Sequence, residues 1–180
     1  MSTKQMLFSG FGGQGILFSG KFIAYKGLME DKQVSWLPSY GPEMRGGTAS
    51  CSVIVSDEPV GSPIVSNPDI LIAMNLPSLD KFESTVVPGG MIFADSTLIE
   101  RKVMRNDVKV FYIPATQLAS DNGTPTLANM IIVGKVLKEI GEYDEEKMTA
   151  ALKKVISAKR ADMLETNLGA MVLGRDYAAE

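Results

Sequence analysis

The sequence predicts an α/β fold with three layers, in which a mostly parallel sheet carries helices on both faces. Short apolar runs bounded by turn residues, typical of buried strands, alternate with longer runs in which apolar residues recur at helical spacing. A length of 180 residues is enough to bury a substantial core, and we expect residues 1–180 to form a single domain. Apolar residues make up 45% of the chain and charged residues 22%, as is usual for a globular protein.

The first half of the chain predicts three strands and a helix. Residues 5–9 form an apolar run that ends in glycine, which indicates a buried strand. Residues 14–26 have helical spacing, with Gly27 as the expected stop. A second strand is expected over 33–37. From Thr48, apolar residues alternate with serines, which predicts a strand with one face more exposed to solvent. This strand is expected to add an antiparallel edge or a hairpin to the sheet.

The second half predicts three more strands and several helices. Apolar runs at 69–75 and 91–95 indicate central strands, and the segment between them has room for a short helix. A further strand is expected over 108–115. Thr124-Pro125 is expected to open a helix that stops at Gly141, since threonine caps helices and proline favours the first turn. The remaining expected helices begin after Asp144 and within 161–173.

Composition excludes several classes of function. The chain has no histidine and one cysteine, Cys51, so a Ser-His-Asp or Cys-His mechanism, an internal disulfide and a four-thiolate cluster are all excluded within it. The net charge of −3 does not indicate nucleic-acid binding. No apolar run has the length of a membrane span, and the N-terminus lacks a signal-peptide pattern. We therefore expect a cytoplasmic location, without nucleic-acid or membrane partners, and Cys51 as a small buried residue.

A glycine-rich turn follows the first predicted strand. The segment GFGGQG places Gly10, Gly12 and Gly15 in the spacing G-x-G-x-x-G, between a strand and a helix, where free N–H groups can hold a phosphate. A dinucleotide site also needs an acidic residue at the tip of the second strand, but that strand ends in WLPSY. The spacing of a P-loop is present too, but Phe22 stands where a magnesium ligand is required. The alternative is that the glycines serve only close packing.

A second glycine-rich segment, SYGPEMRGG, follows the strand expected over 33–37. Glycines at both of its ends indicate a loop of fixed shape, and loops at strand ends of open α/β sheets bind ligands. Arg45 is a candidate for gripping a phosphate or carboxylate. The alternative is a surface pair between Arg45 and Glu43. Two glycine-rich loops at one end of the sheet favour a joint site.

Together, the two segments resemble the gamma subunit of 2-oxoacid:ferredoxin oxidoreductases, which act on pyruvate, 2-oxoisovalerate (ketoisovalerate) or 2-oxoglutarate. The combination of GFGGQGILFSGKFIA with SYGPEMRGGTASCSVIVSD is more specific than either glycine motif alone. NPDILIAMN and TPTLANMIIVGKVL also fit, so the resemblance covers nearly the whole chain.

The resemblance implies an oxidoreductase of several subunits. Its holoenzyme decarboxylates a 2-oxoacid on thiamine diphosphate with magnesium, passes electrons through [4Fe–4S] clusters to ferredoxin and releases an acyl-CoA. Alpha and beta subunits, with a delta chain, carry these cofactors. The chain itself is then expected to bind no cofactor firmly, to have no catalytic or metal-binding residue and to be inactive alone. Its roles would be assembly and coenzyme A binding.

By the same resemblance, the two loops would contact coenzyme A or a neighbouring subunit. Lys21 is a weaker candidate for a phosphate contact, because the helix is expected to turn it away. The candidate residues are Gly10, Gly12, Gly13, Gln14, Gly15, Tyr40, Gly41, Glu43, Arg45, Gly46 and Gly47. Two alternatives remain beside the accessory subunit: a free-standing nucleotide-binding α/β enzyme and a purely structural assembly subunit.

Overall fold

A six-stranded sheet forms the centre of the fold in the computed structural model, which describes residues 2–39 and 48–179. The strands lie in the order β2-β3-β1-β4-β5-β6. Their bounds are β1 (Thr3–Phe11), β2 (Gln33–Ser39), β3 (Thr48–Ser56), β4 (Ile70–Ala73), β5 (Met91–Asp95) and β6 (Lys109–Ile113). The helices are α1 (Ile16–Met29), α2 (Leu76–Phe82), α3 (Ala115–Asp121), α4 (Ala128–Glu139), α5 (Glu145–Val155) and α6 (Met163–Asp176), with 3-10 turns at η2 (Glu83–Thr85) and η3 (Ala158–Arg160).

The direction of the strands confirms the mostly parallel sheet. β1 pairs in parallel with β4, β4 with β5, and β5 with β6. β3 is the exception, since it pairs antiparallel with both β1 and β2. The predicted serine-rich strand is therefore antiparallel. It pairs with the preceding strand β2, as the predicted hairpin alternative requires, but it lies inside the sheet, and β2 forms the edge. The carboxyl ends of the other five strands consequently share one edge of the sheet.

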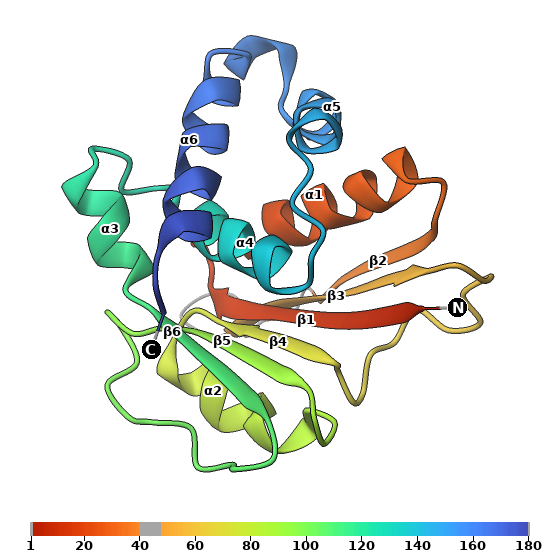
Figure 1. The fold of residues 1–180 in the computed structure, drawn as a ribbon, viewed down its shortest axis with the longest axis vertical. Coiled ribbons are helices and arrows are strands. Elements are labelled where there is room, and N and C mark those ends of the chain that lie inside the picture. The colour runs from red at the N-terminus through yellow and green to blue at the C-terminus, as the bar shows by residue number, and fades with distance from the viewer. Residues whose placement is uncertain (1, 40–47, 180) are drawn as a thin grey trace.

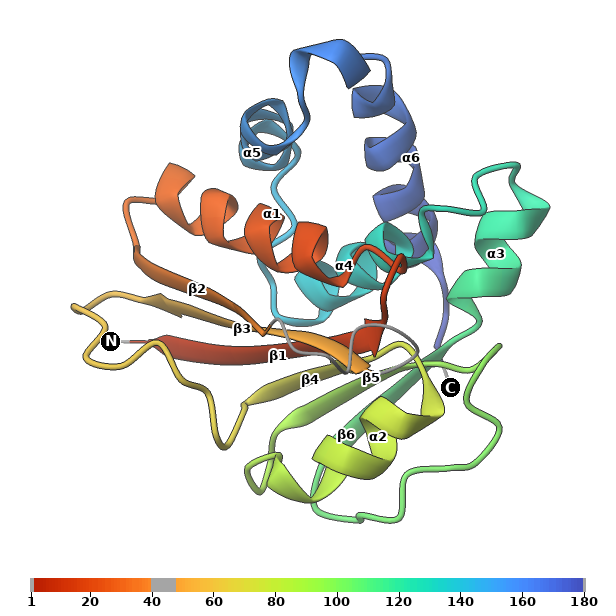
Figure 2. The ribbon, with the colours of Figure 1, turned by 180° about the vertical axis from the view of Figure 1, so that it is seen from behind.

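Helices cover both faces of the sheet and produce the three predicted layers (Figures 1 and 2). α1, α4, α5 and α6 lie on one side, and α2 lies on the other, beside β4, β5 and β6. The strand side chains divide accordingly. Met6, Phe8 and Cys51 belong to the larger apolar core beneath the four helices, whereas Leu7 and Leu71 belong to the smaller one around α2.

Glycines allow α1 to approach β2 and β3 closely. A Cβ atom at Gly20 would lie 2.4 Å from the Cys51 sulfur, and one at Gly27 would lie 2.8 Å from a methyl carbon of Val34. The expectation that Gly27 ends this helix is wrong, because Gly27 lies inside α1 and packs against the sheet. The chain turns later, at Asp31, which has the left-handed φ of 56°.

The packing of α4 against α6 is closer still. A Cβ atom at Gly134 of α4 would lie 2.0 Å from the Met171 carbonyl oxygen, and one at Gly174 of α6 would lie 1.7 Å from the Ile131 carbonyl oxygen. The two helix backbones therefore touch where these glycines lie. Sequence periodicity places both glycines on helices, but only the tertiary structure shows that they face each other's helix.

Two further differences from the sequence expectations lie around α4. The helix begins at Ala128 instead of at Thr124-Pro125, which form a turn in which the Leu127 amide donates to the Thr124 carbonyl. Its predicted end is confirmed, since Gly141 follows the helix with a left-handed φ of 72°. The sequence interpretation missed α3, whose seven residues are too few for a clear helical period. The predicted cap of α5 is confirmed, because the Asp144 carboxylate accepts from the Lys147 amide at 3.1 Å.

Candidate functional site

The first predicted loop is a tight turn between β1 and α1. Gly13 and Gly15 have left-handed φ angles of 90° and 75°, which favour glycine strongly over any residue with a side chain. Gly15 immediately precedes the first residue of α1 and makes no side-chain cap. The turn occupies the edge at which the parallel strands end, where open α/β sheets bind ligands.

Gln14 braces this turn with both ends of its side-chain amide. Its Oε1 atom accepts from the Phe11 amide at 2.6 Å, and its Nε2 atom donates to the Met74 carbonyl, just after β4, at 3.0 Å. A Cβ atom at Gly10 would lie 2.5 Å from the same Oε1 atom, so glycine at position 10 makes room for the brace. Both ends of the Gln14 side-chain amide therefore hydrogen-bond to the chain's own backbone.

Asn129 of α4 braces the turn from the other side. Its Nδ2 atom donates to the Gly15 carbonyl at 3.1 Å and to the Ser19 hydroxyl at 3.0 Å. A Cβ atom at Gly15 would lie 2.4 Å from that nitrogen. The sequence interpretation missed Asn129, although an asparagine inside the apolar run LANMIIV is a recognisable signal of a buried polar contact.

The backbone amides of the turn remain available to a ligand. Within residues 2–39 and 48–179, the N–H groups of Gly12, Gly13 and Gly15 donate to no protein atom, whereas the Gln14 amide donates to the Phe11 carbonyl. Gly12 and Gly13 are exposed. Unpaired N–H groups at the start of a helix are a favourable arrangement for an anion such as phosphate.

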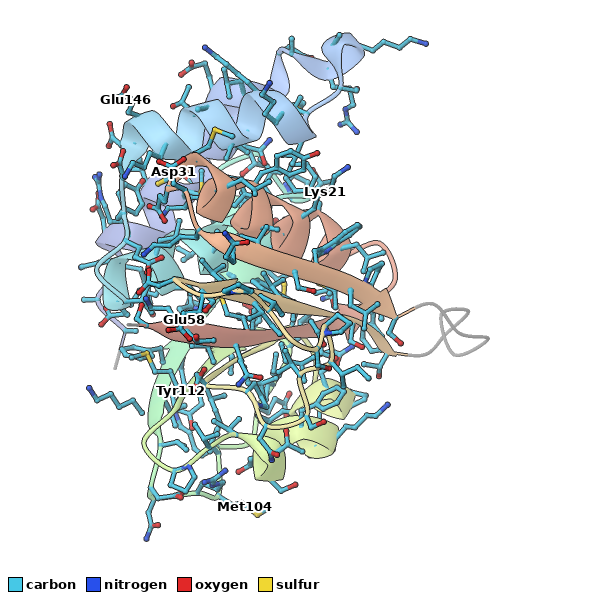
Figure 3. The ribbon with its side chains drawn as sticks, turned by 90° about the vertical axis from the view of Figure 1, so that its right-hand side faces the viewer. Lys21, Asp31, Glu58, Met104, Tyr112 and Glu146 are labelled. Carbon is cyan, nitrogen blue, oxygen red and sulfur yellow. The ribbon has the colours of Figure 1, made fainter. Side chains whose placement is uncertain are left out.

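For the second glycine-rich loop, the structure describes only the residues on either side of it. Tyr40, Gly41, Glu43, Arg45, Gly46 and Gly47 lie outside the described residues. Thr48 pairs with Phe11, and Ser39 pairs with Ser50, so both flanking residues lie at the sheet edge that carries the glycine-rich turn. Lys21, which lies on α1 and is labelled in Figure 3, has its ammonium 6.0 Å from the centroid of the Tyr25 ring.

The strand arrangement differs from that of a dinucleotide-binding fold. In that fold the second strand lies directly beside the first and carries an acidic residue for the ribose. Here β2 follows α1, but β3 separates it from β1. The acidic residue Asp31 lies at the turn before β2, at the opposite end of that strand from its tip.

A cavity of about 420 Å³ lies next to the glycine-rich turn and is bounded partly by Gly15. Its other walls come from the first turn of α1, the start of α4, and the segment that joins α5 to α6. The size falls within the range of small-molecule sites. Asn129 belongs to the cavity wall, so one residue both braces the turn and faces the cavity region.

Two buried ionisable groups are structural. Burial raises the pKa of the Cys51 thiol to about 12, so the thiol is not a nucleophile at neutral pH. Burial also raises the pKa of Asp95, at the end of β5, although the carboxylate accepts from the amides of Thr97 at 3.0 Å and Thr116 at 3.2 Å. Asp95 thereby fastens the first turn of α3 to the sheet.

Neither a metal centre nor a membrane-spanning helix is found in the part of the chain that the structure describes. No group of three or more Cys, Asp or Glu side chains is placed to hold a metal ion there. No helix among those residues is both long and apolar enough to cross a bilayer. The groups that the described site leaves unpaired are backbone amides, beside a neighbouring cavity.

These features define a class of protein: an α/β domain with a glycine-rich turn at the carboxyl edge of a mostly parallel sheet, and without histidine. Comparison with known proteins then assigns the family. Residues 5–177 match the family model described as pyruvate ferredoxin/flavodoxin oxidoreductase, and the chain belongs to this family.

Relatives with known names fall into two groups by length. The chain is 40% identical over 174 residues to ketoisovalerate oxidoreductase subunit VorA of Methanothermobacter thermautotrophicus, covering 96% of this chain and 36% of the relative. It therefore spans about a third of that relative's length. It is 33% identical over 180 residues to 2-oxoglutarate synthase subunit KorC of Methanocaldococcus jannaschii, covering 98% of this chain and 95% of the relative.

Solved structures share the fold. The gamma subunit of a keto/oxoacid ferredoxin oxidoreductase from Geobacter sulfurreducens superposes with a TM-score of 0.81 at 26% identity, covering 96% of both chains. A 2-oxoglutarate:ferredoxin oxidoreductase from Magnetococcus marinus, solved with 2-oxoglutarate, coenzyme A and succinyl-CoA bound, superposes with a TM-score of 0.85 at 24% identity. That match covers 97% of this chain and 31% of the larger one. The predicted family and the predicted fold class are both confirmed.

Proposed function

We propose that this chain is the gamma-type subunit of a 2-oxoacid:ferredoxin oxidoreductase that converts a 2-oxoacid to an acyl-CoA. The observation that carries the proposal is the similarity in sequence and fold to gamma-type subunits. The match to KorC covers 95% of that relative, and the match to the Geobacter gamma subunit covers 96% of that chain. The alternative of a free-standing nucleotide enzyme has no comparable support.

The catalytic cofactors are proposed to lie on partner subunits. The chain has no histidine, and its single cysteine is buried with a raised pKa, so histidine-based acid–base catalysis and cluster ligation must come from elsewhere. Thiamine diphosphate with magnesium and the [4Fe–4S] clusters are accordingly assigned to the alpha, beta and delta chains. Ferredoxin is the proposed electron acceptor of the whole complex, which we place in the cytoplasm.

The contribution of this chain is proposed to be assembly and contact with coenzyme A. The unpaired amides of Gly12, Gly13 and Gly15 support a phosphate contact, and Gly10 and Gln14 shape the turn that presents them. Arg45 is the proposed side-chain partner of the same ligand. The other candidates in the second loop keep the role of ligand or subunit contact: Tyr40, Gly41, Glu43, Gly46 and Gly47.

Exposed apolar side chains at the same sheet edge support docking against larger subunits. Phe11 is the last residue of β1 and is 41% exposed, Leu76 begins α2 after β4, and Leu98 follows β5. All three come from the carboxyl ends of adjacent strands. Large apolar side chains gathered on one edge are typical of a protein–protein contact.

The test is purification of the tagged chain from its source. We expect larger subunits that carry thiamine diphosphate and iron–sulfur clusters to be recovered with it, and 2-oxoacid oxidation that requires coenzyme A. The isolated recombinant chain should oxidise no 2-oxoacid. Recovery as a lone monomer, or turnover by the isolated chain, would contradict the proposal.

A second measurement separates ligand binding from assembly. If the glycine-rich turn and Arg45 contact coenzyme A, then Gly13→Asp and Arg45→Ala raise the KM for coenzyme A in complexes that still assemble, because they remove or repel a phosphate contact. If these residues serve only assembly, the same variants reduce the yield of complex and leave that KM unchanged.

A further inference from the structure

Met104 is the most exposed of the large apolar residues that the structure describes. It is 82% exposed, against 63% for Ile64, which is the next in order. Met104 lies in the connection between β5 and β6, at the end of the molecule opposite Glu146 of α5 (Figure 3). A single exposed apolar side chain is common on a protein surface, but here the segment that carries it is also fixed in place.

A buried carboxylate fixes the backbone of Met104. Glu83 of η2 is 5% exposed, and its Oε1 atom accepts from the Met104 amide. Its Oε2 atom accepts from Nη2 of Arg101 at 2.7 Å, and Arg101 also donates from Nε to the Asp80 carboxylate at 2.9 Å. A buried carboxylate is costly unless ion pairs and hydrogen bonds compensate for its lost hydration. Movement of Met104 away from η2 would remove part of that compensation.

The neighbours of Met104 on both sides are held by polar contacts as well. The Val103 amide donates to the Tyr112 hydroxyl at 2.8 Å. On the other side, Nη1 of Arg105 donates to the Glu83 carbonyl at 3.2 Å. The segment belongs to no helix or strand, so these contacts set its shape in place of a backbone ladder. Because the backbone is already ordered, binding of a partner at Met104 costs less conformational entropy.

Lys102 places a positive charge beside Met104. Its ammonium lies 4.0 Å from the centroid of the Tyr112 ring, and the residue is exposed. Arg101 and Arg105 each pair with an acidic residue, whereas Lys102 has no ion-pair partner in the described part of the chain. A protein surface that covers this segment is electrostatically complementary to it if a carboxylate lies close to Lys102.

These features favour a chain of different sequence over a second copy of this one. Methionine is enriched in protein interfaces and adapts to irregular apolar pockets. Two copies related by a two-fold axis through this surface would bring their Lys102 ammonium groups together, and like charges repel across such a contact. A different chain is free to supply both the pocket and the carboxylate.

We propose that Met104 and Lys102 form the centre of a second docking surface, which receives an apolar pocket with a carboxylate at its rim on another subunit. The proposal rests on the function proposed above, since the partner is a subunit of the same enzyme. The surface lies away from the sheet edge that carries Phe11. The segment returns toward the amino ends of the parallel strands, where the Asp107 carbonyl accepts from the Gly89 amide, just before β5, at 2.7 Å.

The first test is oxidation of Met104 by hydrogen peroxide, followed by mass spectrometry of the peptides. The thioether takes up one oxygen atom to form the sulfoxide, and water is released. In the isolated chain Met104 should react readily, whereas the fully buried Met130 and Met148 should react only after unfolding. In the complex, shown to be intact by size-exclusion chromatography, Met104 should react at least about 10-fold more slowly, because the partner covers it.

The second test is competition between tagged variants and the wild-type chain for incorporation into the complex. Met104→Gln keeps the length of the side chain but makes it polar, and its share of the purified complex should fall about 10-fold relative to the cell extract. Lys102→Glu should reduce the share too, because it reverses the charge that the partner's carboxylate meets. Ile64→Gln is the matched control. It changes another exposed apolar side chain, outside this segment, and should alter the share less than about 3-fold.

The possible outcomes separate this inference from the proposed function. Unchanged oxidation of Met104 in the complex, or equal incorporation of Met104→Gln and Ile64→Gln, would overturn the docking surface and leave the proposed function intact. Protection of Met104 in the isolated chain that increases with protein concentration would assign the surface to a second copy and overturn the proposal. Recovery of the tagged chain without larger subunits would overturn the proposed function and this inference with it. Melting temperatures show whether each variant remains folded, and the oxidation test uses the unaltered chain.

Discussion

The side-chain amide of Asn129 donates to the carbonyl oxygen of Gly15 at 3.1 Å, across 114 residues of sequence. This contact fastens the glycine-rich turn to α4, and it requires the absence of a side chain at position 15. The turn is therefore held in place by the tertiary structure as well as shaped by its own glycines. A turn held in this way would lose less entropy on binding the proposed phosphate than a loose one.

The first prediction concerns the contact between Gly15 and Asn129. Gly15→Ala should lower the free energy of unfolding by about 2–4 kcal/mol, because alanine is strained at a left-handed φ and its Cβ atom would displace Asn129 from two hydrogen bonds. Gly13→Ala is the control, since Gly13 has a similar φ but an open surrounding, and it should cost only about 1–2 kcal/mol. Equal losses in urea denaturation would show that the contact contributes nothing.

The second prediction concerns the contact between α4 and α6. Gly174→Ala should destabilise the protein by about 3 kcal/mol or more, because the added carbon would lie 1.7 Å from the Ile131 carbonyl oxygen and force the helices apart. Gly169→Ala, on the same helix but with open space around its Cβ position, should raise stability by about 0.5–1 kcal/mol through helix propensity. Thermal unfolding of both variants tests this, and a mild effect of Gly174→Ala would contradict the observed approach.

The third prediction concerns the reactivity of Cys51. The thiol is buried and its pKa is raised to about 12, so at pH 8 its thiolate fraction is about 1,000-fold below that of a free cysteine. We expect Ellman's reagent to label the native chain only through unfolding, and the denatured chain rapidly. Fast stoichiometric labelling of the folded chain would show that the thiol is accessible.

The fourth prediction concerns the pH dependence of stability at Asp95. Burial raises the pKa of this carboxyl group in the folded state, so the folded chain binds more protons than the unfolded one above about pH 4. The contribution of Asp95 to stability should therefore decrease as the pH rises from about 4 through the raised pKa. The stability difference between the wild type and Asp95→Asn, measured by denaturation at several pH values, should shrink over that window.

Asp107→Asn provides the control for the pH experiment. Asp107 pairs with Arg105, which lowers its pKa, so the corresponding stability difference should grow as the pH rises through the acidic range. A difference for Asp95 that also grew with pH would mean that its hydrogen bonds outweigh its burial.

The sequence was a sufficient guide where local chemistry dominates. Alternating and apolar runs located the strands, Asp144 located the start of α5, and Gly141 located the end of α4, because caps and left-handed glycines act over a few residues. The predicted helix end at Gly27 is wrong, because a glycine needed for close packing inside a helix has the same local sequence pattern as a glycine that ends one.

By itself, then, the sequence determined the α/β class, the glycine-rich turn and, through its motifs, the family. The tertiary structure decided that β3 lies between β1 and β2, that Asn129 fastens the turn, and that Glu83 fixes the segment that carries Met104. The physical reason is distance along the chain. Propensity and capping depend on neighbouring residues, whereas strand order, buried amide contacts and cavities depend on residues that only folding brings together.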